Sequence, residues 1–148
     1  TMLNPALDAL APRSAAWREA EIPAANGHGN ARSVARIHSA IACGGEVDGV
    51  RLMSEAGCRK IFDVQTDGED LVLGMPVRYG MGFGINSQHQ PLSPNPNVCY
   101  WGGWGGSLGV IDMDARLNFA YVMNRMVSGT TGDLRAANLL LPVYSSLG

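Results

Sequence analysis

The sequence predicts an α+β fold in which an antiparallel sheet is flanked by helices. Helical patterns dominate the first half of the 148-residue chain, and short strand-like segments follow one another in the second half. A helical pattern at 133–147 then provides a cover for the sheet. Separate runs of helices and strands, rather than strict alternation, are typical of α+β proteins. The gaps between the last strands are too short for parallel crossovers, which need about a dozen residues or more.

The N-terminal region predicts one short helix followed by a loop. Asn4 and Pro5 are typical of an N-cap and of proline at the first helical position, so we expect a helix from there to about Pro12. Residues 13–21 are mixed in character. The Pro, Asn and Gly content of 22–30 predicts a loop.

The clearest helical pattern covers residues 31–43. Asn30 can cap the start of this helix, and Gly44 and Gly45 are suited to end it. Side chains spaced three and four residues apart are predicted to share its buried face: Val34, Ile37, His38 and Ile41.

A small hairpin and a further helix are expected between residues 47 and 62. Asp48 and Gly49 tolerate the left-handed backbone of a tight turn, so residues 47–50 predict a hairpin. Ser54 can cap a helix that runs to about Phe62.

The sheet is expected from strand-like segments that follow one another closely. A Gly-rich strand is predicted at 78–85, and a Pro-containing loop follows it. Three more strands are predicted at 98–103, 107–111 and 117–123, with a turn at 112–115. Their short connections favour an antiparallel meander. Three strands are few for a sheet that buries this much apolar surface, so we expect further strands from a segment outside the chain.

The final helical pattern, at 133–147, contains Pro142, which we expect to kink or divide the helix. The side chains predicted to share its inward face are Leu134, Ala137, Leu141 and Tyr144. We expect a helical segment at 1–70 and a sheet with its C-terminal helix at 71–148. Together they would form one domain that lacks its N-terminal segment.

Composition narrows the function classes. The net charge is only -2 and no basic block is present, so neither a nucleic acid nor a membrane surface is expected as a partner. No apolar run is long enough to span a bilayer, and the first residues do not form a signal peptide. The 3 cysteines have no CxxC spacing, which favours reduced thiols and a cytoplasmic location. A chain that starts at Thr1 suggests a fragment or a processed subunit.

No metal or cofactor is expected. The 3 histidines lack the HxH or HExxH spacing of a metal site. His38, on a helical face, is predicted to be partly buried and hydrogen-bonded. His28, between two glycines, is predicted to fasten a loop.

Three nucleophile motifs were tested against the chain. Residues 105–109 match G-x-S-x-G, but a strand rather than a helix follows Ser107, and every histidine precedes it, so the elbow of α/β-hydrolases is disfavoured. The chain's single lysine, Lys60, has Gly57 three residues before it, so no S-x-x-K pair exists. An N-terminal nucleophile at Thr1 is disfavoured because a helix is predicted to follow directly.

Residues 100–112 (YWGGWGGSLGVID) are the most informative stretch. They resemble the third-strand region of class C β-lactamase-like serine hydrolases, especially the family VIII carboxylesterases. In those esterases a W-G-G or H-G-G triplet stands where β-lactamases have K-T-G. Residues 26–49 and 116–124 resemble the flanking parts of the same family, so the likeness spans most of 21–138.

The resemblance implies roles for four residues on one strand. Trp101, Gly102 and Gly103 would replace K-T-G and bind substrate beside Trp104, whose backbone N–H would be one donor of the oxyanion hole. Such donors stabilise the negative oxygen of an acyl-transfer transition state. Loss of the lysine removes a cation that would face the carboxylate of a β-lactam, which favours neutral esters.

The family likeness therefore implies a carboxylesterase that cleaves short-chain esters through an acyl-enzyme. Its nucleophilic serine, its lysine and its catalytic tyrosine would come from an N-terminal segment or chain outside this sequence. The tyrosines here do not stand in the family's Y-x-N context. Other substrates of the same fold stay open, namely β-lactams, D-amino peptides or an acyl-transfer partner, and so does a non-catalytic binding module.

Overall fold

The computed structural model describes residues 8–129 and 131–147, which fall into two compact units, Thr1–Asn30 and Ala31–Gly148. In the first unit a short 3-10 turn, η1 (Ala11–Arg13), precedes the helix α1 (Ala15–Glu19). The N-cap of α1 is Ser14, whose Oγ accepts a hydrogen bond from the Trp17 amide at 3.2 Å.

The helix predicted from Asn4 to about Pro12 lies largely outside the described residues. In its described part only the end is helical, and that end belongs to η1. The helix α1 forms where we predicted no regular structure. The sequence feature that indicates α1 is its N-cap, Ser14. The helix itself is too short to show a helical hydrophobic pattern.

The start of the second unit follows the prediction. Helix α2 (Ala31–Ala42) ends at Gly44 and Gly45, which have φ of 73° and 97°, in the left-handed region that favours glycine. Strands β1 (Glu46–Val47) and β2 (Val50–Arg51) form the predicted hairpin.

The predicted helix after Ser54 is also present. Ser54 Oγ accepts from the Gly57 amide at 3.0 Å and caps α3 (Glu55–Arg59), which continues into a 3-10 turn, η2 (Lys60–Phe62).

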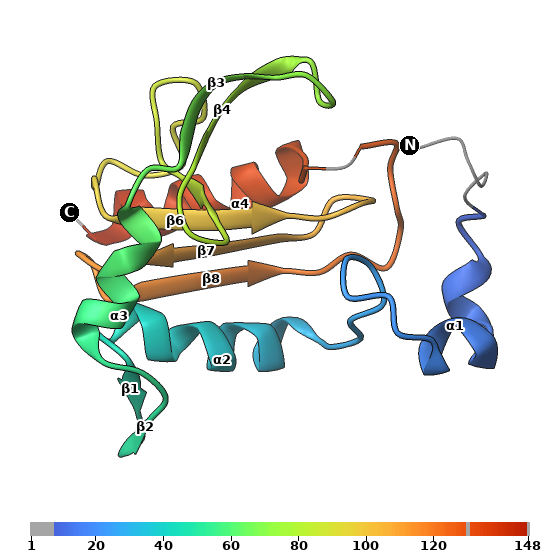
Figure 1. Cartoon of the computed structure of the whole chain (residues 1–148), viewed down its shortest axis with the longest axis horizontal. Helices are drawn as coiled ribbons and strands as arrows, with labels where there is room; N and C mark the ends of the chain where they lie inside the picture. Colours follow the sequence, from blue (N-terminus) through green and yellow to red (C-terminus); the bar gives the residue numbers. More distant parts are fainter. Residues whose placement is uncertain (1–7, 130, 148) are drawn as a thin grey trace. The chain divides into compact units, whose positions relative to one another are not determined.

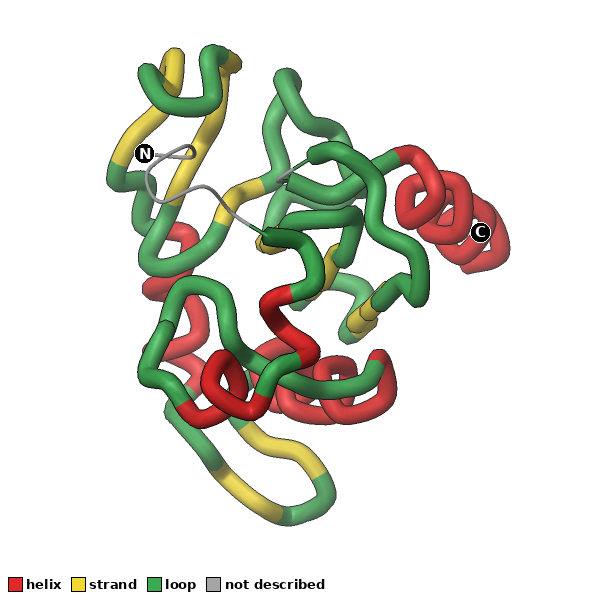
Figure 2. The backbone as a smooth tube through the Cα atoms, turned by 90° about the vertical axis from the view of Figure 1, so that its right-hand side faces the viewer, coloured by secondary structure: helices red, strands yellow, loops and turns green. Residues whose placement is uncertain are grey.

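The sheet has six antiparallel strands, and each pairs with its neighbour in sequence. The strands are β3 (Thr66–Asp70), β4 (Met75–Tyr79), β5 (Gly84–Ile85), β6 (Val98–Gly102), β7 (Leu108–Asp112) and β8 (Leu117–Tyr121). The antiparallel meander predicted for the last three strands is confirmed. Loops, green in Figure 2, join several of these elements, and the connection at 86–97 lies between β5 and β6.

Two predictions for the sheet were wrong. The single strand expected at 78–85 is two antiparallel strands, β4 and β5, paired at Tyr79 and Gly84. The turn between them forms because Gly80 packs directly on the Ile61 carbonyl, where a Cβ would overlap it. Strand β3 was not predicted because its residues are polar and mostly exposed, so it carries no alternating apolar pattern.

Helices cover both faces of the central strands (Figure 1). On one face, α4 (Leu134–Leu147) places Ala136 and Leu140 against Tyr100 and Val110 of the sheet. On the other face, α2 lies along β7 and β8, and Ala42 packs with Cys99 and Ile111. The molecule thus has a helix–sheet–helix arrangement around β6, β7 and β8.

The inward faces of both helices differ only in part from the prediction, since Ile41 of α2 and Tyr144 of α4 do pack against the core. Leu134 and Leu141 of α4 are 77% and 57% exposed, because Ala136 and Leu140 face the sheet instead. Ile37 of α2 is likewise exposed. The fully buried residues of these faces are Ala40 and Ala42 in α2, and Ala136 and Leu140 in α4.

Pro142 does not divide α4, which is continuous through it. Proline leaves the carbonyl four residues earlier, that of Asn138, without its helical partner. Both residues are exposed, so water can bond that carbonyl.

A buried carboxylate ties three parts of the second unit together. Asp112, at the end of β7, is fully buried and accepts five hydrogen bonds from the chain. Its donors are the amides of Asp114 and Ala115, Ser93 Oγ, Asn95 Nδ2 and the Tyr144 hydroxyl. The turn after β7, the loop before β6 and helix α4 are therefore joined at one charged group.

Candidate functional site

The C-terminal half of β6 has an open backbone edge. Strand β5 pairs with β6 only at Cys99 and Tyr100, so Trp101 and Gly102 pair with β7 alone. Successive residues of an antiparallel strand direct their N–H and C=O groups to alternate sides. Gly103 N–H donates to Ser107 on the β7 side at 2.9 Å, so Gly102 directs its groups to the side that β5 has left.

The amide of Trp104 points the same way. The Gly103 carbonyl accepts from the Gly106 amide at 3.1 Å, inside a turn that leads back to β7. Across a planar trans peptide, a carbonyl and the following N–H point in opposite directions. The Trp104 N–H therefore points out of this turn, and within 8–129 and 131–147 we find no hydrogen bond from it.

The turn at 103–106 is held firmly by its surroundings. The Gly105 amide donates to Gly129 at 2.9 Å, and its carbonyl accepts from Arg135 Nη2 at 3.0 Å. Arg135 is itself fixed by Asp133, whose pKa it lowers chiefly through their hydrogen bonds. Gly105 and Gly106 have φ of 88° and 118°, so the left-handed backbone of this turn favours glycine.

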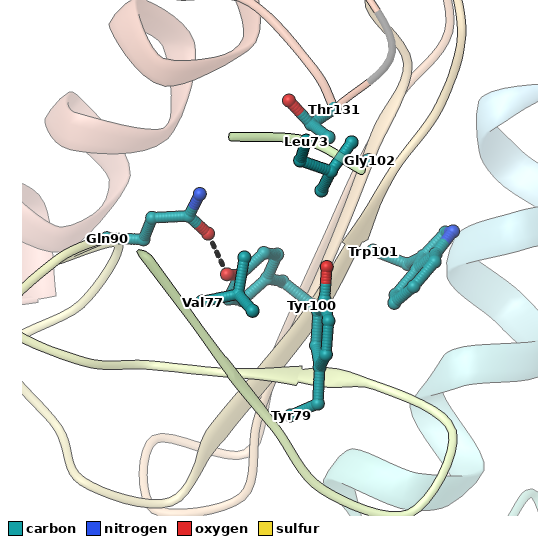
Figure 3. Close-up of a pocket in the computed structure, with 8 residues that line it drawn as sticks. All are labelled: Leu73, Val77, Tyr79, Gln90, Tyr100, Trp101, Gly102 and Thr131. Atoms are coloured by element: carbon teal, nitrogen blue, oxygen red, sulfur yellow. Dashed lines mark hydrogen bonds between the residues drawn. The ribbon is translucent and has the colours of Figure 1, made fainter. Parts of the chain in front are cut away.

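A cavity of about 150 Å³ lies at the open edge of β6, between β6 and β4. Its lining is apolar or uncharged: Leu73, Val77, Tyr79, Gln90, Tyr100, Trp101, Gly102 and Thr131 (Figure 3). The rings of Tyr79 and Trp101 lie 5.8 Å apart between centroids, with 40° between their planes. The space beside the free backbone groups is therefore aromatic and without charge.

Tyr100 closes one side of this cavity. Its hydroxyl donates to Gln90 Oε1, as the dashed line in Figure 3 shows. Burial, and to a smaller extent the nearby Tyr79, raises the pKa of Tyr100 to about 12, so the phenol stays neutral and can donate. A second cavity, of about 310 Å³, lies between the loop at 86–97 and α4, and it shares Gln90, Tyr100 and Thr131 with the first.

The predicted site residues lie together at this edge. Trp101 is 55% exposed and lines the cavity. Gly102 must be glycine, because a Cβ would overlap the Thr131 carbonyl, and a Cβ on Gly103 would overlap Ser107 Oγ. Trp104 is half-buried at the start of the turn. Ser107 leads into β7 rather than a helix, as expected for a serine outside a nucleophile elbow.

Several lining residues were not predicted from the sequence. Leu73 and Val77 belong to a hairpin that the hydrophobic pattern does not reveal, and Gln90 lies in a loop. The sequence gives Tyr79 and Tyr100 no site role, because neither stands in the family's Y-x-N context. Alternation along β6 could have placed Tyr100 on the buried face, but not beside Gln90.

The histidines form no site in the described part of the chain, where no group of three or more metal-ligating side chains occurs. His38 packs on Gly109 and meets the Phe83 ring edge-on, at 6.3 Å between centroids. It is partly buried as predicted, but its Nδ1 has no hydrogen-bond partner, contrary to the prediction. Burial lowers its pKa. Among the described helices, none has the length and apolarity to cross a membrane.

The family model for β-lactamases matches residues 2–143. The chain belongs to the β-lactamase family. A solved family VIII carboxylesterase is 38% identical and superimposes with a TM-score of 0.90 over 97% of this chain. A penicillin-binding protein homologue from Caulobacter crescentus is 37% identical over 90% of the chain, with a TM-score of 0.85. The resemblance seen at residues 100–112 is thus confirmed for family and fold.

A curated relative, the esterase/β-lactamase LipL of Mycobacterium tuberculosis, is 34% identical over 133 residues. The matched region is 86% of this chain but only 29% of LipL. The chain likewise covers 39% of the carboxylesterase structure and 36% of the Caulobacter protein. It therefore corresponds to the C-terminal portion of this β-lactamase-like fold.

Proposed function

We propose that this β-lactamase-family chain supplies the oxyanion-hole strand and one wall of the substrate cleft in a serine carboxylesterase. Trp104 N–H is the oxyanion donor from this chain, and Trp101, Gly102 and Gly103 line the cleft. The substrate is a neutral, short-chain carboxylic ester. The observation that carries the proposal is the open edge of β6, where the Trp104 amide has no partner among the described residues.

The site's lack of charge supports an ester substrate. No residue that lines the edge cavity is charged, and tryptophan stands where β-lactamases carry a lysine. A β-lactam or a D-amino peptide brings a carboxylate that such a wall cannot pair. An uncharged ester has no carboxylate, so it needs no charged partner when it moves from water into this site.

The nucleophile and its base come from the rest of the enzyme in this proposal. The chain has no S-x-x-K pair, and Ser107 Oγ lies beside the Gly103 position rather than above the open edge. The carbonyl of the ester would lie with its oxygen at Trp104 N–H, and the attacking serine would approach from the N-terminal segment. The serine's own N–H would be the second oxyanion donor.

The test compares the 148-residue chain with a protein that joins it to a segment carrying S-x-x-K. Only the joined protein should label with a fluorophosphonate and hydrolyse p-nitrophenyl acetate or butyrate. Robust turnover by the 148-residue chain alone would contradict the assignment of the nucleophile. A joined protein that folds but neither labels nor hydrolyses would instead be a binding module, and faster hydrolysis of nitrocefin than of esters would make it a β-lactamase.

A further inference from the structure

Two of the side chains that line both cavities beside β6 are hydrogen-bonded to each other. The edge cavity of about 150 Å³ and the second cavity, of about 310 Å³, share Tyr100, Gln90 and Thr131 in their linings. The hydrogen bond from the Tyr100 hydroxyl to Gln90 Oε1 joins these two residues (Figure 3). We name this pair the partition.

The two halves of the partition are held differently. Tyr100 is only 8% exposed, and its ring lies on Gly84, where a Cβ would be 2.6 Å from the ring carbon Cζ. Gln90 lies in the loop at 86–97, and its backbone is held by hydrogen bonds to Ser87. The tyrosine is therefore the fixed half, and the glutamine side chain is the half that can be removed without disturbing the sheet.

The size of the edge cavity sets a limit on what it can hold. A cavity of about 150 Å³ accommodates a group of roughly benzene size. The second cavity is about 310 Å³, and besides Asp133 its lining includes the apolar side chains of Leu92, Leu108 and Leu134. A chain that passed the partition would therefore find further apolar surface to bury.

We infer that the partition of Tyr100 and Gln90 determines how long an apolar arm of the ester this site accepts. The inference rests on the proposed esterase function and adds a specificity-determining residue, Gln90, to it. The arm enters at the open edge, beside the oxyanion donor, and stops at the hydrogen-bonded pair. The arm is either the acyl chain or the alcohol, which share the same chemistry here.

The test replaces Gln90 by alanine in the joined protein. In a first series, kcat/KM is measured for p-nitrophenyl esters of acyl chains from acetate to decanoate. In a second series, kcat/KM is measured for acetates of alcohols of the same lengths. Gln90→Ala should raise the octanoate-to-butyrate ratio, or its alcohol counterpart, by about tenfold or more, since each methylene newly held in an apolar pocket changes kcat/KM by roughly tenfold. Tyr100→Phe, which keeps the ring but loses the donor, should move the ratio in the same direction by less.

Gln88→Ala is the matched control, because Gln88 is exposed on the same loop and lines neither cavity. If kcat/KM depends on chain length in the same way for Gln90→Ala and Gln88→Ala in both series, the inference is overturned while the esterase function stays in place. An inactive wild type would instead count against the proposed function.

A binding measurement tests the partition without any catalysis. Methyl butyl ketone and methyl octyl ketone are carbonyl compounds that the enzyme cannot hydrolyse. Each is titrated into the 148-residue chain while the chemical shift of the Trp101 indole N–H is followed. Gln90→Ala should strengthen binding of the longer ketone relative to the shorter by about tenfold. An unchanged ratio of the two dissociation constants overturns the inference whatever the activity.

Discussion

Replacing Trp104 by proline removes one hydrogen-bond donor from the open edge of β6 and leaves the turn beneath it able to form. Residues 103–106 close a turn through the Gly106 amide and the Gly103 carbonyl, with Gly105 at φ 88°. A glycine of positive φ at the third position is the mark of a type II turn, in which proline at the second position is common. Trp104 holds that second position, so proline fits the backbone, lacks the N–H and places its ring Cδ where the amide hydrogen was.

The expected loss follows from the role of the amide. Removing one oxyanion-hole donor lowers kcat by roughly 10²–10³-fold, equivalent to about 2.7–4 kcal/mol of transition-state stabilisation. KM for p-nitrophenyl butyrate should change little, because the donor acts most strongly on the charged oxygen of the transition state.

Trp104→Ala is the matched control. It removes the indole but keeps the N–H, so kcat should stay within about tenfold of the wild type, in contrast to the loss expected for the donor itself. Circular dichroism and urea unfolding of both variants check that the turn survives. Equal kcat for Trp104→Pro and the wild type, with the fold intact, would refute the oxyanion role of this amide.

Three further predictions concern stability and the close packing of the site. Asp112→Ala should lower the free energy of unfolding by about 3 kcal/mol or more, because it leaves several buried donors unpaired. The control Asp114→Ala loses only exposed hydrogen bonds from Asn97 and should lower the free energy of unfolding by about 1 kcal/mol. Urea unfolding measures both variants. Burial lowers the pKa of His38 in the folded state below its unfolded value of about 6.5. At a pH between the folded and the unfolded pKa, the unfolded state binds a proton that the folded state does not. The stability that is present above about pH 6.5 is therefore lost as the pH falls toward the folded pKa. The urea midpoint of His38→Leu should therefore fall less between about pH 7.5 and pH 5 than that of the wild type or of the exposed-site control His89→Gln. Gly102→Ala should lower esterase activity, and it should lower stability by about 1–3 kcal/mol, because the new Cβ would overlap the Thr131 carbonyl. The control Gly27→Ala should have little effect, because its Cβ would meet nothing within 4 Å. Activity assays and thermal unfolding compare the two variants.

Local signals predicted the fold where residues act on their immediate neighbours. The glycines after α2, the Asp48–Gly49 turn and the Ser54 cap all work within a few residues, and each element they mark is present. The short connections between β6, β7 and β8 likewise allowed only antiparallel pairing.

The errors occurred where distant parts of the chain decide the outcome. Gly80 bends the chain because it packs on Ile61, nineteen positions away, and no local pattern reveals this contact. The inward face of α4 is set by close contact of Ala136 and Leu140 with the sheet, so the larger leucines at 134 and 141 misled the prediction. Strand β3 forms by pairing with β4 rather than by burying its own side chains.

The candidate site divides in the same way. The glycine and tryptophan motif located the strand and its family, and the roles of Trp101, Gly102, Gly103 and Trp104 remain predictions. The cavity beside them could not be foreseen, since it is built from β4, a loop and the segment near Thr131. Only the folded chain brings these parts to one strand edge.

The pairing order of the sheet also bears on how the chain reaches its final structure. Because every strand hydrogen-bonds to the strand next to it in sequence, each step of assembly closes a short loop and loses little chain entropy. Local pairing of this kind speeds formation of the sheet, whereas the packing of α2 on β7 and β8 joins distant parts of the chain. The open edge of β6, which is proposed to receive an ester carbonyl, thus forms between strands that are neighbours in the sequence.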